Sequence, residues 1–207
     1  MDDFVDAGDH LELVSEKDLQ ERRVAVLMTD GVEQVEYTGP RSFLEGKGVR
    51  VTLISPKAVG EEIQGMNHDQ PGDRFKVELS LADANVNDYD ALLLPGGEEN
   101  PKKLRRIPEA VAFIKEFDDA DKPIAAICHG PWPLIEAGIA ESKHLTSYPA
   151  IQDDLKAAGA EWTDDEVVVD GKLITSRKPE DIPAFNDAIM KQLMVIQQAG
   201  KDPGPTS

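Results

Sequence analysis

Cys128 is the only cysteine of the chain, and it stands where the apolar run Pro123-Ile-Ala-Ala-Ile ends and His-Gly-Pro follows. A turn from a strand into a helix holds a side chain over the carboxyl end of a sheet, where open α/β folds bind ligands. The following backbone N–H groups and the positive end of such a helix favour the thiolate over the thiol. We interpret Cys128 as a nucleophile rather than an inert core cysteine, because the His-Gly-Pro sequence after it is unusual in a packed core.

Two further segments with polar or glycine-rich sequence follow apolar runs of strand length. They are Asp30–Glu36 and Pro95–Glu99, and with Cys128–Gly130 they make a set of three. In a doubly wound sheet the carboxyl ends of the strands lie along one edge. We therefore expect these segments to share one cleft, although residues far apart in the sequence contribute to it.

Strand-like and helix-like patterns alternate along the chain. Continuous apolar runs predict buried parallel strands, and helical spacing of apolar residues predicts the helices between them. A late hairpin is predicted with Asp170-Gly171 as its turn. The expected strands are 23–29, 49–54, 89–95, 123–128 and the hairpin 166–175, and the expected helices are 33–47, 101–120, 131–137, 151–158 and 182–198. This alternation predicts an α/β fold with a mainly parallel sheet and helices on both faces.

Two parts of this pattern carry more specific expectations. In the first helix Val35, Phe43 and Leu44 are expected to point inward, and Gly39-Pro40 is expected to kink or interrupt it. Residues 56–73 are rich in Gly, Glu, Asn and Asp, which predicts a loop or small excursion.

Composition excludes several classes of protein. The 40 acidic and 22 basic residues give a net charge of −18, which argues against binding a nucleic-acid backbone. No run reaches the length of a membrane span, and the acidic start differs from a signal peptide. A single cysteine allows no internal disulfide, so we expect a cytoplasmic protein. From the charge and the absence of long apolar runs we expect no nucleic-acid or membrane partners.

The chain length suits one domain with extensions at both ends. We expect residues 1–21 to form an acidic N-terminal extension, residues 22–198 one domain, and residues 199–207 a flexible tail. His10, His68 and His144 are scattered, with no second ligand at suitable spacing. We therefore expect no metal site.

Four sequence blocks together resemble the ThiJ/PfpI family, most closely its branch of PfpI intracellular proteases. They span about residues 22–195 in matching order and spacing, and such a combination is far more specific than a lone Cys-His pair. The resemblance implies a flavodoxin-like three-layer sandwich related to glutamine amidotransferase domains, a homo-oligomer of two or more copies, and no cofactor. The blocks are Asp30–Glu36, Leu94–Gly97, Ala125–Pro131, and Thr146–Pro149 with Gly159–Trp162 and Thr175–Arg177.

The resemblance assigns roles to particular residues. Cys128 matches the nucleophile, His129 the histidine after it, and Glu36 the carboxyl group that approaches the thiol. The N–H groups of Gly97 and His129 match the oxyanion hole, and Tyr148 is a weaker candidate for the cleft wall. Three of these residues have a structural alternative. Glu36 is then an ordinary surface glutamate of a helix, Gly97 part of a tight turn, and Tyr148 a packed tyrosine before proline.

Lys102 departs from the family pattern. In the PfpI peptidases a glutamate from a neighbouring subunit completes a Cys-His-Glu arrangement, and Lys102 stands at the corresponding position. Without that carboxylate the histidine lacks a group to orient it, which places peptidase activity in doubt. The resemblance thus favours a stress-protective, glyoxalase- or deglycase-like enzyme acting on reactive dicarbonyls or their protein adducts. An intracellular cysteine peptidase, a non-enzymatic thiol redox sensor and a binding scaffold are the alternatives.

Overall fold

The computed structural model describes residues 19–195, which form a sheet of seven strands in the order β11-β12-β8-β7-β1-β3-β6. Neighbouring strands run parallel, except that β11 is antiparallel to β12. The mainly parallel sheet expected from the sequence is confirmed. Its strands are β1 (Arg23–Leu27), β3 (Arg50–Ser55), β6 (Leu79–Ser80), β7 (Ala91–Leu94), β8 (Ile124–Ile127), β11 (Val167–Asp170) and β12 (Leu173–Ser176).

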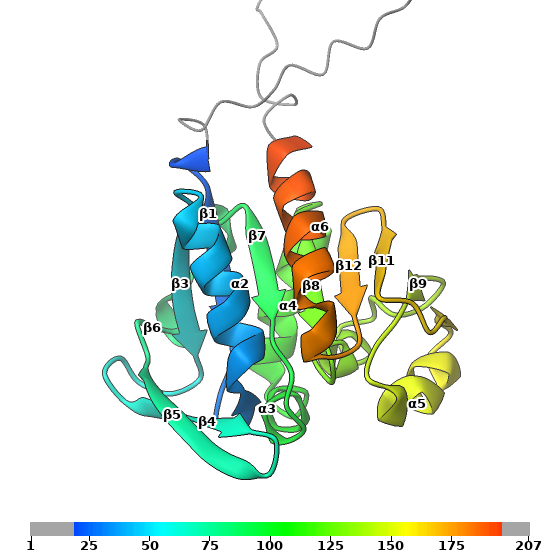
Figure 1. The fold of residues 1–207 in the computed structure, drawn as a ribbon, viewed down its shortest axis with the longest axis horizontal. Helices are drawn as coiled ribbons and strands as arrows, with labels where there is room; N and C mark the ends of the chain where they lie inside the picture. Colours follow the sequence, from blue (N-terminus) through cyan, green and yellow to red (C-terminus); the bar gives the residue numbers. More distant parts are fainter. Residues whose placement is uncertain (1–18, 196–207) are drawn as a thin grey trace, which may run out of the picture.

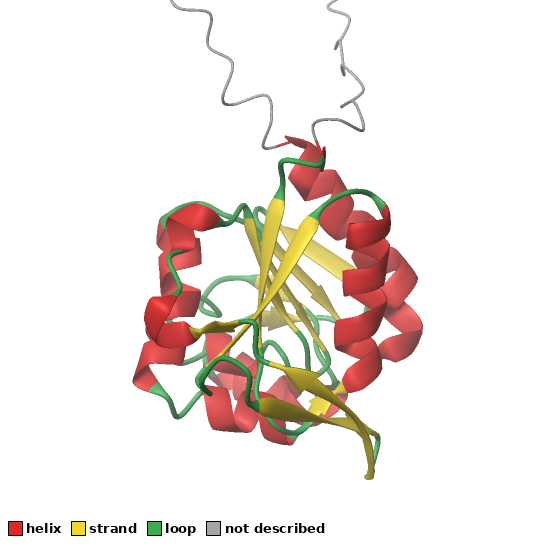
Figure 2. Ribbon diagram, turned by 90° about the vertical axis from the view of Figure 1, so that its left-hand side faces the viewer, coloured by secondary structure: helices red, strands yellow, loops and turns green. Residues whose placement is uncertain are grey.

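Helices cover both faces of this sheet, as Figures 1 and 2 show. The helices α2 (Gln34–Gly46) and α6 (Ile182–Val195) pack on one face. The other face carries α3 (Glu99–Leu104), α4 (Pro108–Asp119) and α5 (Gln152–Ala157). Short 3₁₀ turns lie between these elements, at η1 (Leu81–Asp83), η2 (Val86–Asp88), η3 (Trp132–Leu134), η4 (Pro149–Ile151) and η5 (Pro179–Asp181). The predicted three-layer α/β sandwich is therefore confirmed.

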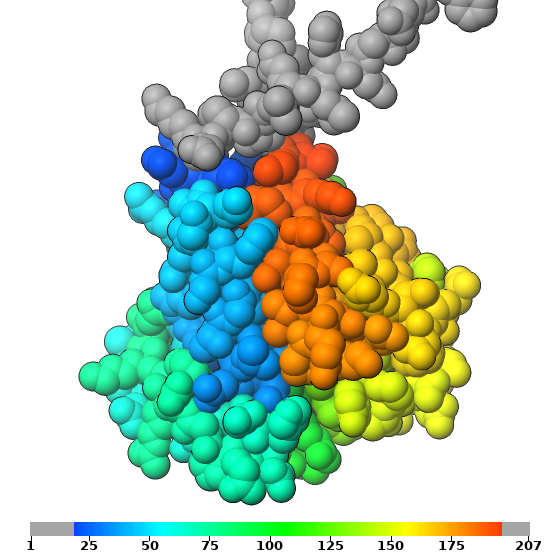
Figure 3. Space-filling model, in the orientation of Figure 1, coloured from blue at the N-terminus to red at the C-terminus, as the bar shows by residue number. Residues whose placement is uncertain are grey.

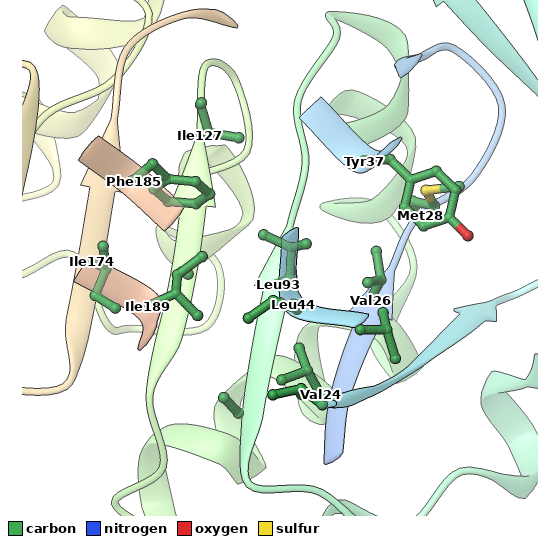
Figure 4. Close-up of a cluster of buried hydrophobic side chains, with 14 of the residues drawn as sticks. Val24, Val26, Met28, Tyr37, Leu44, Leu93, Ile127, Ile174, Phe185 and Ile189 are labelled. Carbon is green, nitrogen blue, oxygen red and sulfur yellow. The ribbon is translucent and has the colours of Figure 1, made fainter. Parts of the chain in front are cut away.

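The strands are apolar on both faces because each face is covered. In β1, Val24 and Val26 belong to the core under α2 and α6, whereas Ala25 and Leu27 belong to the core on the opposite face. Figure 4 shows the first of these cores, in which Phe185 of α6 packs on the same face of the sheet. Such burial on both sides explains why the central strands read as uninterrupted hydrophobic runs.

The helix α2 differs from the expectation in two respects. It continues without interruption through Pro40, whose ring removes only the hydrogen bond to the carbonyl of Glu36. Its buried face carries Glu36, Tyr37, Pro40 and Leu44, whereas Val35 is 39% exposed. The expectation that Val35 points inward is wrong, because the helix begins at Gln34 and turns that side chain outward.

Residues 56–73 are not mainly loop. They contain β4 (Glu62–Asn67), which pairs with β5 (Gln70–Lys76) in a hairpin, and the short β2 (Val32–Glu33) pairs with β4. His68, at the turn, has a φ of +57°. The hairpin lies at the carboxyl-end edge of the main sheet (Figure 1), and it forms the lower end of the space-filling view in Figure 3.

The bounds of three other elements also differ from those predicted from the sequence. The helical pattern over 101–120 divides into α3 and α4 just before Pro108, and the expected helix at 131–137 is the 3₁₀ turn η3. The hairpin turn is Gly171-Lys172, since Asp170 pairs with Leu173. A separate small sheet joins β9 (His144–Leu145) to β10 (Glu161–Trp162).

Residues 1–18 of the expected acidic extension, and the whole expected tail at 199–207, lie outside the described residues. Within residues 19–195 no helix combines the length and apolarity that a membrane span requires.

Candidate active site

Cys128 follows β8 directly and has a φ of +63°, a backbone conformation that residues other than glycine rarely adopt. Two glycines make room for this turn. A Cβ atom at Gly96 would lie 2.7 Å from the Cβ of Cys128, and one at Gly130 would overlap the carbonyl oxygen of Leu94. This strained turn, called the elbow below, holds Cys128 at the carboxyl end of the sheet.

A cavity of about 450 Å³ opens above this elbow. The side chain of Cys128 is only 8% exposed but lines the cavity, so it is not sealed in the core. The structure brings all five residues proposed from the sequence to this cavity. The lining residues are Glu33, Glu36, His68, Gly97, Glu98, Cys128, His129, Tyr148, Ala150, Lys178, Pro179 and Glu180.

Glu36 is a fully buried carboxyl group beside the thiol. One of its oxygens, Oε1, accepts a hydrogen bond from the N–H of Gly96 at 3.1 Å, whereas Oε2 is buried without a hydrogen-bond partner. Burial, reinforced by the nearby charge of Glu33, raises the pKa of Glu36 from 4.5 to about 8. Glu36 is therefore protonated at neutral pH and can donate a hydrogen bond.

The electrostatics of Cys128 differ from the sequence-based expectation. Burial raises the pKa of the thiol, and the charge of an ionised Glu36 raises it further. The N–H groups of His129 and Gly97 act in the opposite direction. The 3₁₀ turn η3 follows the cysteine in place of the α-helix expected from the sequence, so no α-helix dipole acts on the thiol. Stabilisation of a thiolate thus depends on these N–H groups and on a proton held by Glu36.

His129 lies closer to the thiol than its place in the sequence suggested. Its Nδ1 is 3.3 Å from the Sγ of Cys128, and its ring stacks on Tyr148 with centroids 4.8 Å apart. Burial lowers the pKa of His129, although the charge of Glu98 opposes this effect. At neutral pH the ring is neutral and suited to accept a proton.

The backbone at Gly97 lines the cavity and makes a close approach to a neighbouring segment. Gly97 has a φ of +75°, and a Cβ there would overlap the carbonyl oxygen of Gly31. Only glycine fits this approach. The N–H groups of Gly97 and His129 both lower the pKa of the Cys128 thiol, so both favour negative charge at this end of the cavity.

Glu33 lies in the segment Asp30–Glu36 that was expected at the cleft, as a cap or orienting residue, and its side chain makes no capping hydrogen bond. Both carboxylate oxygens of Glu33 accept a hydrogen bond from the N–H of His68, at 3.2 and 3.1 Å, which ties the hairpin to the site. Other residues around the cavity were not singled out from the sequence. Lys178 and Glu180 lie at η5, the 3₁₀ turn that directly precedes α6 in the sequence. They are exposed charged residues in a loop, a type for which sequence patterns carry no signal.

Lys102 lies outside this cavity, on α3. Its Nζ is 3.5 Å from a carboxylate oxygen of Glu99. In residues 19–195 no carboxylate forms a hydrogen bond with the ring of His129; Glu98 lines the same cavity and acts on His129 only through its charge. The same residues contain no group of three or more His, Cys, Asp or Glu side chains arranged to hold a metal ion.

The sequence model of the DJ-1/PfpI family matches residues 22–192. A Bacillus subtilis (strain 168) protein named "Putative cysteine protease YraA" is 41% identical over 165 residues, which covers 80% of this chain and 94% of the relative. A protein of Pyrococcus abyssi (strain GE5 / Orsay) named as a deglycase is 39% identical over 171 residues, covering 83% of this chain and 99% of the relative.

Solved structures show the same fold. An Anabaena variabilis protein with DJ-1/ThiJ/PfpI-like and ferritin-like domains superposes with a TM-score of 0.78 at 33% identity, covering 90% of this chain and 52% of that two-domain chain. Drosophila melanogaster DJ-1beta superposes with a TM-score of 0.75 at 28% identity, covering 86% of this chain and 96% of that chain.

Proposed function

Because this chain belongs to the DJ-1/PfpI family, we propose that it is a cysteine-dependent hydrolase of reactive dicarbonyls, free or as early adducts on the amino groups of proteins. The products are 2-hydroxy acids, and for an adduct also the released amine. This proposal includes a protective role against carbonyl stress in the cytoplasm.

The observation that carries the proposal is the buried carboxyl group of Glu36 beside Cys128. A protonated carboxyl can donate a hydrogen bond to the thiolate and then exchange that proton with a bound carbonyl compound. The side chains of Glu36 and Cys128 interact directly and both residues line the cavity, which supports proton exchange between this carboxyl and a carbonyl compound bound at the sulfur.

The chemistry for methylglyoxal runs in three steps. The sulfur of Cys128 adds to the aldehyde carbon, and the resulting oxyanion is held by the N–H groups of Gly97 and His129 and then protonated. Glu36 supplies the proton for that oxyanion and so becomes a carboxylate, which then removes the hydrogen of the same carbon as a proton and returns it to the neighbouring carbon. The hydroxyl proton passes from the first oxygen to the second, and the hemithioacetal becomes a thioester of the hydroxy acid. Water then cleaves the carbon–sulfur bond. One carbon is oxidised, its neighbour is reduced, and the net change is addition of water.

A cysteine peptidase is the second candidate. It is favoured by the distance of 3.3 Å between the Nδ1 of His129 and the Sγ of Cys128, which suits a base that activates a nucleophile. The lysine at position 102 argues against it, because a histidine without an orienting carboxylate is a weak base. We therefore place dicarbonyl hydrolysis first.

The test compares methylglyoxal and peptide turnover by the wild type and Cys128→Ala, with Val59→Ala as a control at a side chain that is 60% exposed. We expect Cys128→Ala to lose methylglyoxal turnover by at least about a thousandfold, a size typical of losing a nucleophile. Cys128-dependent cleavage of peptides alone would favour the peptidase. Peroxide oxidation of Cys128, seen by intact mass, without turnover of either substrate would favour the redox sensor.

A further inference from the structure

Asn100 carries a fully buried amide that no step of the proposed reaction uses. It is the second residue of α3, which lies at the carboxyl-end edge of the sheet (Figure 1). Close packing surrounds its backbone, because a Cβ at Gly31 would lie 2.5 Å from that of Glu99 and 3.3 Å from the backbone N of Asn100. The backbone that carries this side chain therefore has little room to move.

Both ends of the Asn100 amide are hydrogen-bonded. Its Oδ1 accepts from the N–H of Thr29, after β1, at 2.8 Å. Its Nδ2 donates to the carbonyl oxygens of Pro95 and Gly96, after β7, at 3.0 and 3.1 Å. A primary amide supplies one acceptor and two donors together, so asparagine matches this set of partners, whereas a carboxylate offers no donor and an aliphatic side chain offers neither.

The two carbonyl groups held by Asn100 belong to the same peptide units as two N–H groups of the site. In a trans peptide the C=O and the N–H lie in one plane and point in opposite directions. Holding the oxygen of Pro95 thus directs the N–H of Gly96 the other way, and this N–H donates to the Oε1 of Glu36 at 3.1 Å. Holding the oxygen of Gly96 fixes the direction of the N–H of Gly97 in the same manner.

The N–H of Gly97 acts on the reacting sulfur, since it lowers the pKa of the Cys128 thiol. The peptide that carries it lies between two glycines, and glycine accepts both signs of φ, so no side chain prevents this peptide from turning over. The N–H of Glu33 also reaches the Gly96 oxygen, but at 3.4 Å, so the bond from Asn100 is the shorter of the two. A peptide that has turned over would present a carbonyl oxygen to the sulfur and would repel a thiolate.

We infer that Asn100 is a positioning residue, which holds the turn after β7 so that the N–H of Gly97 faces Cys128 and the oxyanion formed on the substrate. The part of this inference that concerns the oxyanion rests on the proposed function, whereas the part that concerns the thiolate does not depend on any substrate. Without the two donors of Asn100, the peptide after Gly96 is free to turn over. Addition of the sulfur to the carbonyl is then slowed, while substrate binding is little changed.

The test replaces Asn100 by Leu, which has a similar size and removes all three hydrogen bonds. We expect the kcat for methylglyoxal to fall roughly a hundredfold, a size typical of losing one oxyanion donor, with KM within about threefold of the wild type. Alkylation of Cys128 by iodoacetamide at about pH 9 should slow at least about tenfold, because the thiolate loses one hydrogen bond. This second measurement needs no turnover.

Leu104→Ala is the matched control, because it loosens the packing of the same helix at a core residue outside the cavity. Thermal unfolding shows how far each variant is destabilised, and the control should be destabilised yet keep both rates near those of the wild type. Asn100→Asp is the second variant in case the leucine variant does not fold. It keeps an acceptor for the N–H of Thr29 but removes the donors to the two carbonyls, and it should lose both rates as well.

Wild-type rates in folded Asn100→Leu or Asn100→Asp overturn the inference, and so does an equal loss in Leu104→Ala. A loss of turnover with alkylation at the wild-type rate also overturns it, because the N–H of Gly97 then still faces the sulfur. Slow alkylation in the Asn100 variants of a protein that does not turn over methylglyoxal supports the positioning role and overturns the proposed function instead.

Discussion

Replacing Glu36 by Gln tests whether this carboxyl group is neutral in the folded protein. Glutamine keeps the size of the side chain and the oxygen that accepts from the N–H of Gly96, but it cannot ionise. Burial and the charge of Glu33 raise the pKa of Glu36 from 4.5 to about 8. At about 1.4 kcal/mol per pH unit, ionising Glu36 costs the folded state roughly 5 kcal/mol more than it costs the unfolded chain.

The sign of the pH dependence follows from this direction. Below about pH 4.5 the carboxyl is protonated in both states and contributes nothing that changes with pH. Between about pH 4.5 and about pH 8 the folded protein keeps a proton that the unfolded chain has lost, so the free energy of unfolding falls as the pH rises. Above about pH 8 both states are ionised and this contribution becomes constant.

Urea unfolding between about pH 5 and about pH 9 measures the effect. Both proteins carry Cys128→Ser, so that the thiol does not titrate. The protein with Glu36 should lose roughly 4 kcal/mol relative to the Glu36→Gln variant across this range, and most of the loss should occur below about pH 8. Parallel curves for the two proteins would show that Glu36 is ionised at neutral pH, and the proton relay assigned to it would then be wrong.

Three further substitutions probe the elbow, the cavity wall and the core. Gly96→Ala places a Cβ 2.7 Å from that of Cys128, so methylglyoxal turnover should fall at least about a hundredfold and stability by about 1–3 kcal/mol; unchanged kinetics would show that the elbow is not tightly packed. Tyr148→Ala removes the ring stacked on His129, worth about 0.5–1.5 kcal/mol, and should raise KM several-fold with a smaller change in kcat. Leu92→Ala, at a fully buried position, should cost about 2–5 kcal/mol in urea unfolding without changing kcat.

The main sheet was predictable because its central strands are covered on both faces. Continuous apolar runs such as Ala91–Leu94 and Ile124–Ile127 have few other stable placements in a chain of this size. The hairpin β4–β5 was missed for the opposite reason. Its second strand is mostly exposed, and Gly65, Pro71 and Gly72 break the alternation that marks a strand.

Helix boundaries depended on details that a local pattern does not record. Pro40 is tolerated inside α2, which packs against α6 where a Cβ at Gly39 would lie 3.4 Å from Ile182. After Cys128, in contrast, the N–H groups of Trp132, Leu134 and Ile135 bond to carbonyls three residues back, so the chain forms a 3₁₀ turn where an α-helix was expected.

For the site, the residues with unusual chemistry could be identified from the sequence. Cys128, Gly97 and Glu36 follow strand ends, and their convergence at one edge was predicted from the alternating pattern. Glu98 lies in the segment Pro95–Glu99 that was expected at the cleft, whereas Lys178 is a charged residue in a surface segment, and only the folded chain shows that it faces the cavity. The position of the His129 ring depends on the positive φ of the elbow, which no spacing rule encodes.

The most direct test of the central claim is to trap the bond between substrate and sulfur. Wild-type protein is mixed with methylglyoxal, quenched in acid during turnover, and its intact mass and peptide map are measured. We predict an adduct on Cys128 that appears and decays with turnover, and neither adduct nor turnover in Cys128→Ala. Turnover that persists in Cys128→Ala, or an adduct that stays on the sulfur while product forms at full rate, would contradict the assignment of Cys128 as the nucleophile.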